Sequence, residues 1–165
     1  TGTQKDDMER IFSRYLKTYK DLDYVTAFLV KAAEINCTTG SQSAFVTTNS
    51  ISQGEQVAML WPIISNLGSE ISFAHRSFKW SNLASNKAAV ICIIVGLRRP
   101  SGGQKKIFDD QSVRLVDNIN PYLIPAPNVI VEKTRLFSKF WVRGFELVSL
   151  LKETVLGTYL LFRMQ

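Results

Sequence analysis

The sequence is poor in residues that bind metal ions or form cross-links. Its 165 residues include two cysteines, Cys37 and Cys92, and one histidine, His75. A structural zinc ion takes about four such ligands, so we expect no metal site. Both cysteines lie among apolar residues and far apart in the sequence, which favours two reduced core thiols over a disulfide.

Long apolar runs are also absent. The longest is shorter than the roughly 20 residues that a membrane-spanning helix needs, and no signal peptide is visible. We therefore expect a cytoplasmic protein with no membrane partner. The net charge of +6 and the pI near 9.4 favour an anionic partner such as nucleic acid.

A third absence is a glycine-rich turn that leads from a strand into a helix. Nothing before Ala44 provides the first strands or the glycine turn that a nucleotide-binding α/β domain needs. Gly102 and Gly103 lie in the basic segment Arg98–Lys106, which does not join a strand to a helix. They are therefore no substitute for that turn.

The run from Ala44 to Leu97 has the pattern of the second half of such a domain. Ala44–Thr47 and Ile71–Ala74 read as short strands, and Ala88–Leu97 reads as a strand that is apolar without alternation. A strand of this kind is usually buried on both faces. We therefore expect it to be antiparallel and inserted between the other two, because at a sheet edge it would invite aggregation.

Apolar residues at helical spacing predict three helices. Two lie near the N-terminus, over Met8–Tyr19 and Tyr24–Ile35, and Asp21 or Asp23 can cap the second. The third follows the capping box Ser52–Glu55 and ends at a glycine, residue 68. The expected fold class is α/β: a partial, Rossmann-like half-sheet in three layers, with an antiparallel final strand and flanking helices.

The segment between the last two predicted strands, Arg76 to Lys87, is expected to be a large loop. It carries Phe78 and Trp80 among Arg76, Lys79, Asn82 and Lys87. Exposed aromatic residues with basic and amide neighbours suit a protein that stacks on a nucleobase. The alternative is that both aromatics are core residues under the loop.

Polar residues follow the first predicted strand, where α/β folds place their ligands. We assign the rim of a substrate pocket to Thr48, Asn49, Ser50 and Arg76. The alternative is an ordinary turn, since such residues favour turns. His75 ends a strand at the same rim, and we interpret it as a structural residue.

Basic residues near this rim and after the last strand are candidates for contacts with DNA phosphates. They are Lys79, Lys87, Arg98, Arg99, Lys105 and Lys106. The alternative for the segment after the last strand is a solvated basic loop that contacts nothing.

Four stretches together resemble a known family: FVTTNSISQGEQV, ISFAHRSFKW, NKAAVICIIVGL and NPYLIPAPNVIVE. They are similar to the DNA methyltransferase region of large bacterial class I enzymes that methylate adenine, the gamma-type amino-methyltransferases of restriction–modification systems. The likeness runs from about Gln4 to about Lys133. It implies that the chain is a fragment of an adenine-specific DNA methyltransferase, equivalent to the C-terminal half of the catalytic domain.

The family's mechanism implies roles for the loop aromatics. These enzymes flip the target adenine out of double-stranded DNA and transfer a methyl group to its exocyclic amino group from S-adenosylmethionine. Two aromatic side chains sandwich the flipped base. One belongs to an Asn-Pro-Pro-aromatic motif, and the other belongs to the loop that corresponds to Arg76–Lys87. Phe78 is the first choice for that second aromatic and Trp80 is the second choice.

In the family, the Asn-Pro-Pro-aromatic motif comes just before a segment like TGTQKDDMERIF, with which this sequence starts. The resemblance therefore implies that the catalytic motif and the S-adenosylmethionine turn are missing here. We expect S-adenosylmethionine in the complete enzyme, no cofactor and no activity for this chain alone, and a separate N-terminal half as a candidate partner. Whether the chain is a gene remnant or works with such a partner stays open.

The expected domain organisation has three parts. Residues 1–99 form the C-terminal half of the catalytic domain, and residues 100–133 form a basic linker and an extended segment toward an absent target-recognition domain. Residues 134–165 form a divergent or disrupted tail. An alternative function is that of a non-catalytic, basic nucleic-acid-binding protein.

Overall fold

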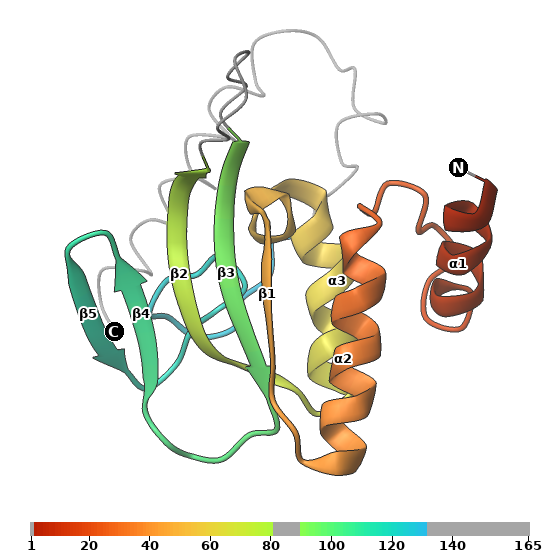
Figure 1. The fold of residues 1–165 in the computed structure, drawn as a ribbon. Helices are drawn as coiled ribbons and strands as arrows, with labels where there is room; N and C mark the ends of the chain where they lie inside the picture. The colour runs from red at the N-terminus through yellow and green to blue at the C-terminus, as the bar shows by residue number, and fades with distance from the viewer. Residues whose placement is uncertain (1, 81–89, 132–165) are drawn as a thin grey trace, which may run out of the picture. The chain divides into compact units, whose positions relative to one another are not determined.

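The computed structural model describes residues 2–80 and 90–131. Predictions for residues 81–89 and for the tail from 134 to 165 lie outside the described residues; these include Asn82 and Lys87. The helices and strands, in chain order, are α1 (Gly2–Phe12), α2 (Val25–Thr39), β1 (Ser43–Thr48), the 3-10 helix η1 (Asn49–Ser52), α3 (Gly54–Asn66), β2 (Glu70–Trp80), β3 (Val90–Arg98), β4 (Lys105–Asp109) and β5 (Ser112–Val116) (Figure 1).

The strands form one mixed sheet in the order β1-β3-β2-β4-β5. Strand β3 is antiparallel to both β1 and β2, so the predicted insertion of the apolar strand between the other two is confirmed. Strand β4 runs parallel to β2, and β5 is antiparallel to β4. The apolar run of β3 follows from this central place, since Ile93, Val95 and Leu97 are fully buried.

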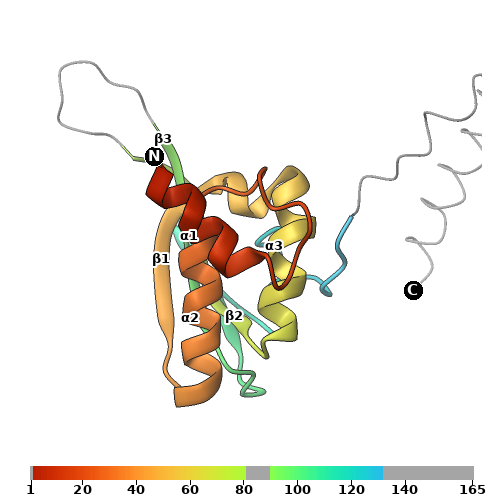
Figure 2. The same ribbon diagram turned by 90° about the vertical axis from the view of Figure 1, so that its right-hand side faces the viewer.

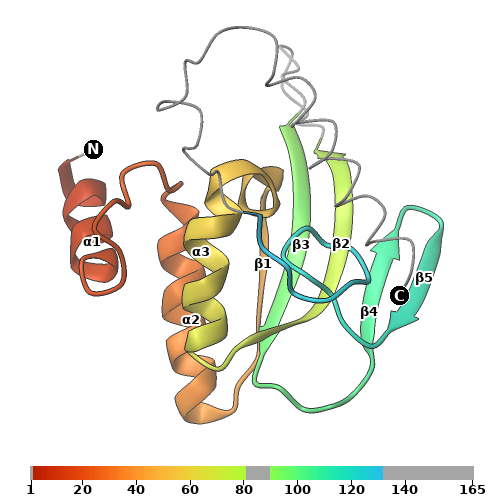
Figure 3. The same ribbon diagram turned by 180° about the vertical axis from the view of Figure 1, so that it is seen from behind.

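Helices α2 and α3 cover one face of the sheet (Figure 2). Residues 117–131 cross on the same side, next to α3, where Ile119 and Leu123 join the core (Figure 3). Within residues 2–80 and 90–131 no helix lies on the other face. The prediction of three layers is therefore wrong for the described part of the chain, which has two.

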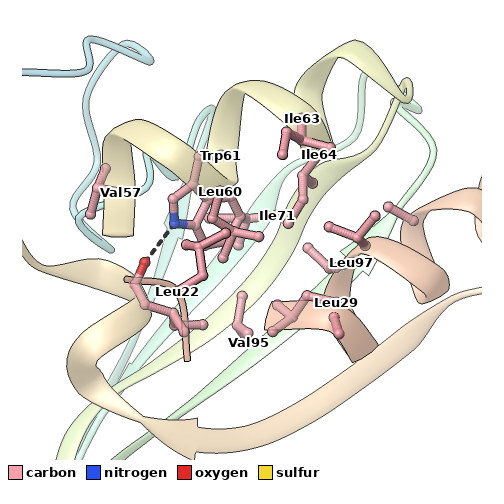
Figure 4. Packing of buried hydrophobic residues seen from close by; sticks show 14 of the residues in the cluster. Leu22, Leu29, Val57, Leu60, Trp61, Ile63, Ile64, Ile71, Val95 and Leu97 are labelled. Atoms are coloured by element: carbon pink, nitrogen blue, oxygen red, sulfur yellow. Dashed lines mark hydrogen bonds between the residues drawn. The ribbon is translucent and has the colours of Figure 1, made fainter. Parts of the chain in front are cut away.

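The core lies between the sheet and these two helices. Leu29 from α2 and Leu60 and Ile64 from α3 pack toward β3 (Figure 4). Complete burial of such a side chain contributes about 1.5–3 kcal/mol. The indole N–H of Trp61 donates to the carbonyl of Ile51 at 2.7 Å, which fixes η1 on α3.

The helix bounds differ from the predicted ones: α1 begins at Gly2 and not Met8, and α2 continues to Thr39 and not Ile35. The first helix ends at Phe12, not Tyr19, because the amides of Tyr15 and Leu16 both donate to the Phe12 carbonyl and turn the chain. The third helix begins at Gly54 with Gln53 as its N-cap, one residue after the predicted cap Ser52, whose hydroxyl donates to the Asn49 carbonyl at 2.9 Å.

No aspartate side chain caps α2, whose N-cap is Tyr24 without a side-chain hydrogen bond. The predicted glycine terminator of α3 is confirmed, since Gly68 has a φ of 70° and the Ser69 amide donates to the Ile64 carbonyl at 3.1 Å.

The sheet is larger than predicted. Strand β2 continues to Trp80, which pairs with Val90 past a bulge between His75 and Phe78. Strands β4 and β5 form a hairpin where the sequence suggested a basic linker. Ile107 of that hairpin is fully buried, and the pair Asp109–Ser112 closes it.

Candidate nucleic-acid interface

The predicted stacking and pocket-rim residues lie at the end of the sheet where the parallel strands β1 and β2 finish. Thr48, the last residue of β1, pairs with Cys92 of β3, and Phe78 of β2 pairs with the same residue. Directly opposed residues point to the same face of a sheet. Thr48 and Phe78 therefore share the face without helices, about 10 Å apart across two strand spacings.

The two candidate stacking residues belong to a strand, which corrects the prediction of a loop for residues 76–80. Phe78 is half-buried and Trp80 is 51% exposed. Their ring centroids are 6.3 Å apart with the planes tilted by 51°. The imidazole of His75 meets the Phe78 ring edge-on at 5.1 Å. Neither aromatic belongs to the buried core, so the reading of both as core residues is wrong.

The polar turn after β1 is fixed by hydrogen bonds between side chains. The hydroxyls of Thr48 and Ser50 lie 2.7 Å apart, and Ser50 donates to the carboxylate of Asp23 at 2.5 Å. Gln56 of α3 accepts a hydrogen bond from the Asp23 amide at 3.3 Å. Asp23 thus connects the start of α2 with the predicted pocket rim, a role that sequence reasoning missed.

Arg76, the fourth predicted rim residue, has a different partner. Its Nε lies 3.5 Å from a carboxylate oxygen of Asp109 in β4, and Arg114 of β5 lies 3.3 Å from the other oxygen. A cavity of about 440 Å³ adjoins this group. Asp109 and Arg114 were also missed, and the one local signal there is the polar run Asp109–Ser112 between the apolar residues Phe108 and Val113.

Two of the residues predicted to contact DNA phosphates, Arg98 and Lys105, form ion pairs with Glu70. The carboxylate of Glu70 lies 2.8 Å from the ammonium of Lys105 and 3.0 Å from Nε of Arg98. Burial alone would raise the pKa of Glu70, but hydrogen bonds and charges from Lys105 and Arg98 outweigh burial and hold that pKa below its ordinary value. Lys105 is buried, so the reading of a solvated loop is wrong for this residue.

This cluster lies at the opposite end of the sheet from the aromatics. Glu70 pairs with Arg98, whereas Phe78 lies eight residues further along β2, about 25 Å away at the usual rise of a strand. Lys79, Arg99 and Lys106 are exposed, and their contact with DNA stays a prediction.

Within the described ranges, no cluster of three His, Cys, Asp or Glu side chains could hold a metal ion. Cys37 and Cys92 are free thiols. No helix in the described part of the chain is long and apolar enough to cross a membrane.

Comparisons with known proteins give three findings. Residues 1–109 match the family described as MmeI, DNA-methyltransferase domain. DNA methyltransferase A of Bacillus subtilis (strain 168) is 44% identical over 128 residues, which are 77% of this chain and 14% of that protein. The solved structure of the Type IIL restriction-modification enzyme MmeI in complex with DNA matches 82% of this chain with a TM-score of 0.75 and 43% identity, and 19% of that chain is covered.

Proposed function

The chain belongs to the family of MmeI DNA-methyltransferase domains, and on that premise we propose that it is the base-binding part of an adenine-specific DNA methyltransferase of a restriction–modification system. The chain spans less than a fifth of the length of the relatives described above. The activity of the complete enzyme, including transfer of a methyl group to a flipped adenine, therefore belongs to the proposal.

The observation that carries this proposal is the pair Phe78 and Trp80 at the end of the β2–β3 ribbon. Base stacking on an aromatic side chain is worth about 1–3 kcal/mol, which offsets much of the few kcal/mol that base flipping costs. Trp80 exposes half of its surface, and the ring of Phe78 lies beside the Trp80 ring, with the two centroids 6.3 Å apart. In our proposal Trp80 contacts the base and Phe78 holds Trp80 in place, which reverses the order expected from the sequence.

The polar turn Thr48–Ser50 supplies groups for the edge of the base. Hydroxyl and amide side chains both donate and accept hydrogen bonds, as recognition of a base edge requires. The hydrogen bonds from Ser50 to Asp23 and between Ser50 and Thr48 hold this turn in one conformation. Ordering the turn in advance lowers the entropy cost of binding.

In our proposal the described residues do not hold S-adenosylmethionine by themselves. The turn from β1 to α3 contains no glycine between Thr48 and Gln53, and a Cβ added at Gly54 would have no heavy atom within 4 Å. In our proposal the cofactor supplies the methyl group in the complete enzyme and is held by residues outside this chain. The role of this chain is to bind and orient the base.

Two features support docking of the remaining part of a methyltransferase domain. Strand β1 is an edge strand of the described sheet, with β3 as its one partner there. On the face without helices the register aligns one residue from each of the five strands, four of them apolar: Val46, Ile94, His75, Phe108 and Val113. Val46 and Val113 are each more than half exposed. A separate N-terminal half would pair with β1 and cover this row.

Binding of the full 165-residue chain to a single-stranded oligonucleotide that carries the fluorescent adenine analogue 2-aminopurine tests the proposal. Trp80→Ala is expected to weaken binding by about 1–3 kcal/mol, or roughly five- to 150-fold. Ile91→Ala is the matched control, because Ile91 is an exposed apolar residue of the same ribbon. Equal affinities for Trp80→Ala, Phe78→Ala and the parent chain would contradict the proposal.

A further inference from the structure

Two arginines from different strands share one carboxylate at the tip of the β4–β5 hairpin. Asp109 is the last residue of β4, Arg76 comes from β2 and Arg114 from β5. Nε of Arg76 lies 3.5 Å from one carboxylate oxygen, and Nη2 of Arg114 lies 3.3 Å from the other. The group carries two positive charges and one negative charge.

Stability does not explain this arrangement well. The side chains of Arg76, Asp109 and Arg114 are 37%, 30% and 47% exposed, and ion pairs with this exposure usually contribute little to stability. The buried cluster around Glu70 is different, since the Lys105 side chain there is 6% exposed. The ion pairs with Asp109 thus keep the guanidinium groups of Arg76 and Arg114 close together and accessible to solvent.

The same group borders a cavity of about 440 Å³, lined by Arg76, Ser77, Asp109, Gln53 and Tyr122 among others. The cavity lies where the parallel strands β2 and β4 end, which is the usual place for ligands in α/β sheets. Gln53 in this lining is the N-cap residue of α3. Arg76 and Asp109 line the cavity, and Arg114 reaches the Asp109 carboxylate from β5.

We propose that Arg76 and Arg114 bind one backbone phosphate of DNA, and that Asp109 occupies their guanidinium groups while DNA is absent. A phosphate carries the same charge as the carboxylate that it replaces, and its oxygens match the planar donor fork of arginine. Asp109 is at a hairpin tip, where its displaced carboxylate can turn to water. Arg76 precedes Phe78 and Trp80 by two and four residues, about 7 and 13 Å along a strand. Arg76 lines the cavity with Gln53 and Leu123 on the side of α3, whereas Phe78 faces the side without helices, so the phosphate would belong to the DNA backbone near the β2–β3 ribbon.

This inference rests on the proposed function, because it needs DNA as the partner. Its test is fluorescence anisotropy of a labelled duplex with the full chain over a series of KCl concentrations. Asp109→Asn removes the competing carboxylate and is expected to raise DNA affinity about two- to fivefold, the size of one lost exposed ion pair. Asp7→Asn is the matched control. It makes the same charge change at an exposed Asp–Arg pair, with Arg10 at 2.7 Å on α1, and is expected to change affinity far less.

The salt dependence gives a second measurement. Arg114→Gln is expected to weaken binding and to lower the slope of log affinity against log salt by about one. Arg76→Gln is expected to do the same, and the double variant to lose no more than about one, because both arginines contact the same phosphate. Arg10→Gln on α1 is expected to leave the slope unchanged.

The outcomes separate this inference from the proposed function. If the parent chain binds the duplex but Asp109→Asn and Asp7→Asn act equally, or if Arg114→Gln leaves the slope unchanged, the inference is wrong and DNA binding stands. If neither the parent nor any variant binds the duplex, both are wrong.

Discussion

The carboxylate of Glu70 lies 2.8 Å from the ammonium of Lys105 and joins the parallel strands β2 and β4. Lys105 also donates to the side-chain oxygen of Asn118 at 2.9 Å, and the amide of Asn118 donates to the carbonyl of Ala126 at 2.7 Å. This chain of contacts ties the segment after the sheet to β4. The Glu70–Lys105 pair is therefore a structural centre at the end of the sheet opposite the proposed interface.

Glu70→Gln is expected to destabilise the chain by about 3 kcal/mol, because it leaves the buried ammonium of Lys105 without a countercharge. Urea unfolding followed by circular dichroism measures this change. Asp7→Asn removes the countercharge of the exposed Arg10, while the new amide oxygen can still accept from the Tyr24 hydroxyl, and should cost less than about 1 kcal/mol. Equal losses in the two variants would mean that the Glu70 cluster has no special role.

The ion pairs of Glu70 predict that the stability of the folded protein depends on pH. The folded protein holds the pKa of Glu70 below its ordinary value of 4.5, so at acidic pH the unfolded chain binds more protons than the folded one. The stabilisation is present above that ordinary value and is lost as the pH falls through the lower, folded pKa. The pKa of Glu34 is lowered as well: burial raises it, but hydrogen bonds from Lys31 and Tyr15 and the charge of Arg14 outweigh burial.

Urea midpoints measured from about pH 7 down to about pH 3 test this linkage. The parent chain should lose stability on acidification, and Glu70→Gln should lose less of it over the same range. The variant Glu34→Gln should flatten the curve in the same direction. Parallel curves for the parent and both variants would argue against the assigned pKa shifts.

Gly96 of β3 is expected to tolerate no side chain. A Cβ at this position would lie 2.3 Å from Cε1 of Phe73 and 2.8 Å from Oγ of Ser72. Gly96→Ala should therefore cost about 1–3 kcal/mol through overpacking, seen as a lower Tm. Gly103→Ala is the control, since its nearest heavy atom would be 3.7 Å away. A Tm for Gly96→Ala that matches the control would contradict the close packing of β2 on β3.

The order β1-β3-β2 could be predicted from the sequence because β3 is apolar on both faces and must be buried. The extent of β2 could not. Arg76-Ser77-Phe78-Lys79-Trp80 has the polar, mixed pattern of a loop, yet Phe78 and Trp80 pair with Cys92 and Val90. Tertiary pairing overrides local pattern here.

The burial of Lys105 could not be predicted from the sequence either. Lysine is almost never fully buried unless it is paired, and its partner Glu70 is 35 residues earlier in the sequence. The β4–β5 hairpin has two strands of five residues each, too short and too charged for a clear alternation. The site residues Thr48, Phe78 and Trp80 were identified from residue type and position after a strand, and their shared face follows only from the register.

A chimera tests the central claim most directly. In DNA methyltransferase A of Bacillus subtilis, the matching segment of 128 residues would be replaced by the corresponding part of this chain, and methyl transfer from labelled S-adenosylmethionine to duplex DNA would be measured. The account predicts methylation of adenine that Trp80→Ala in the chimera strongly reduces while calorimetry shows unchanged cofactor affinity. A folded chimera that binds S-adenosylmethionine and DNA but methylates no adenine would contradict the account.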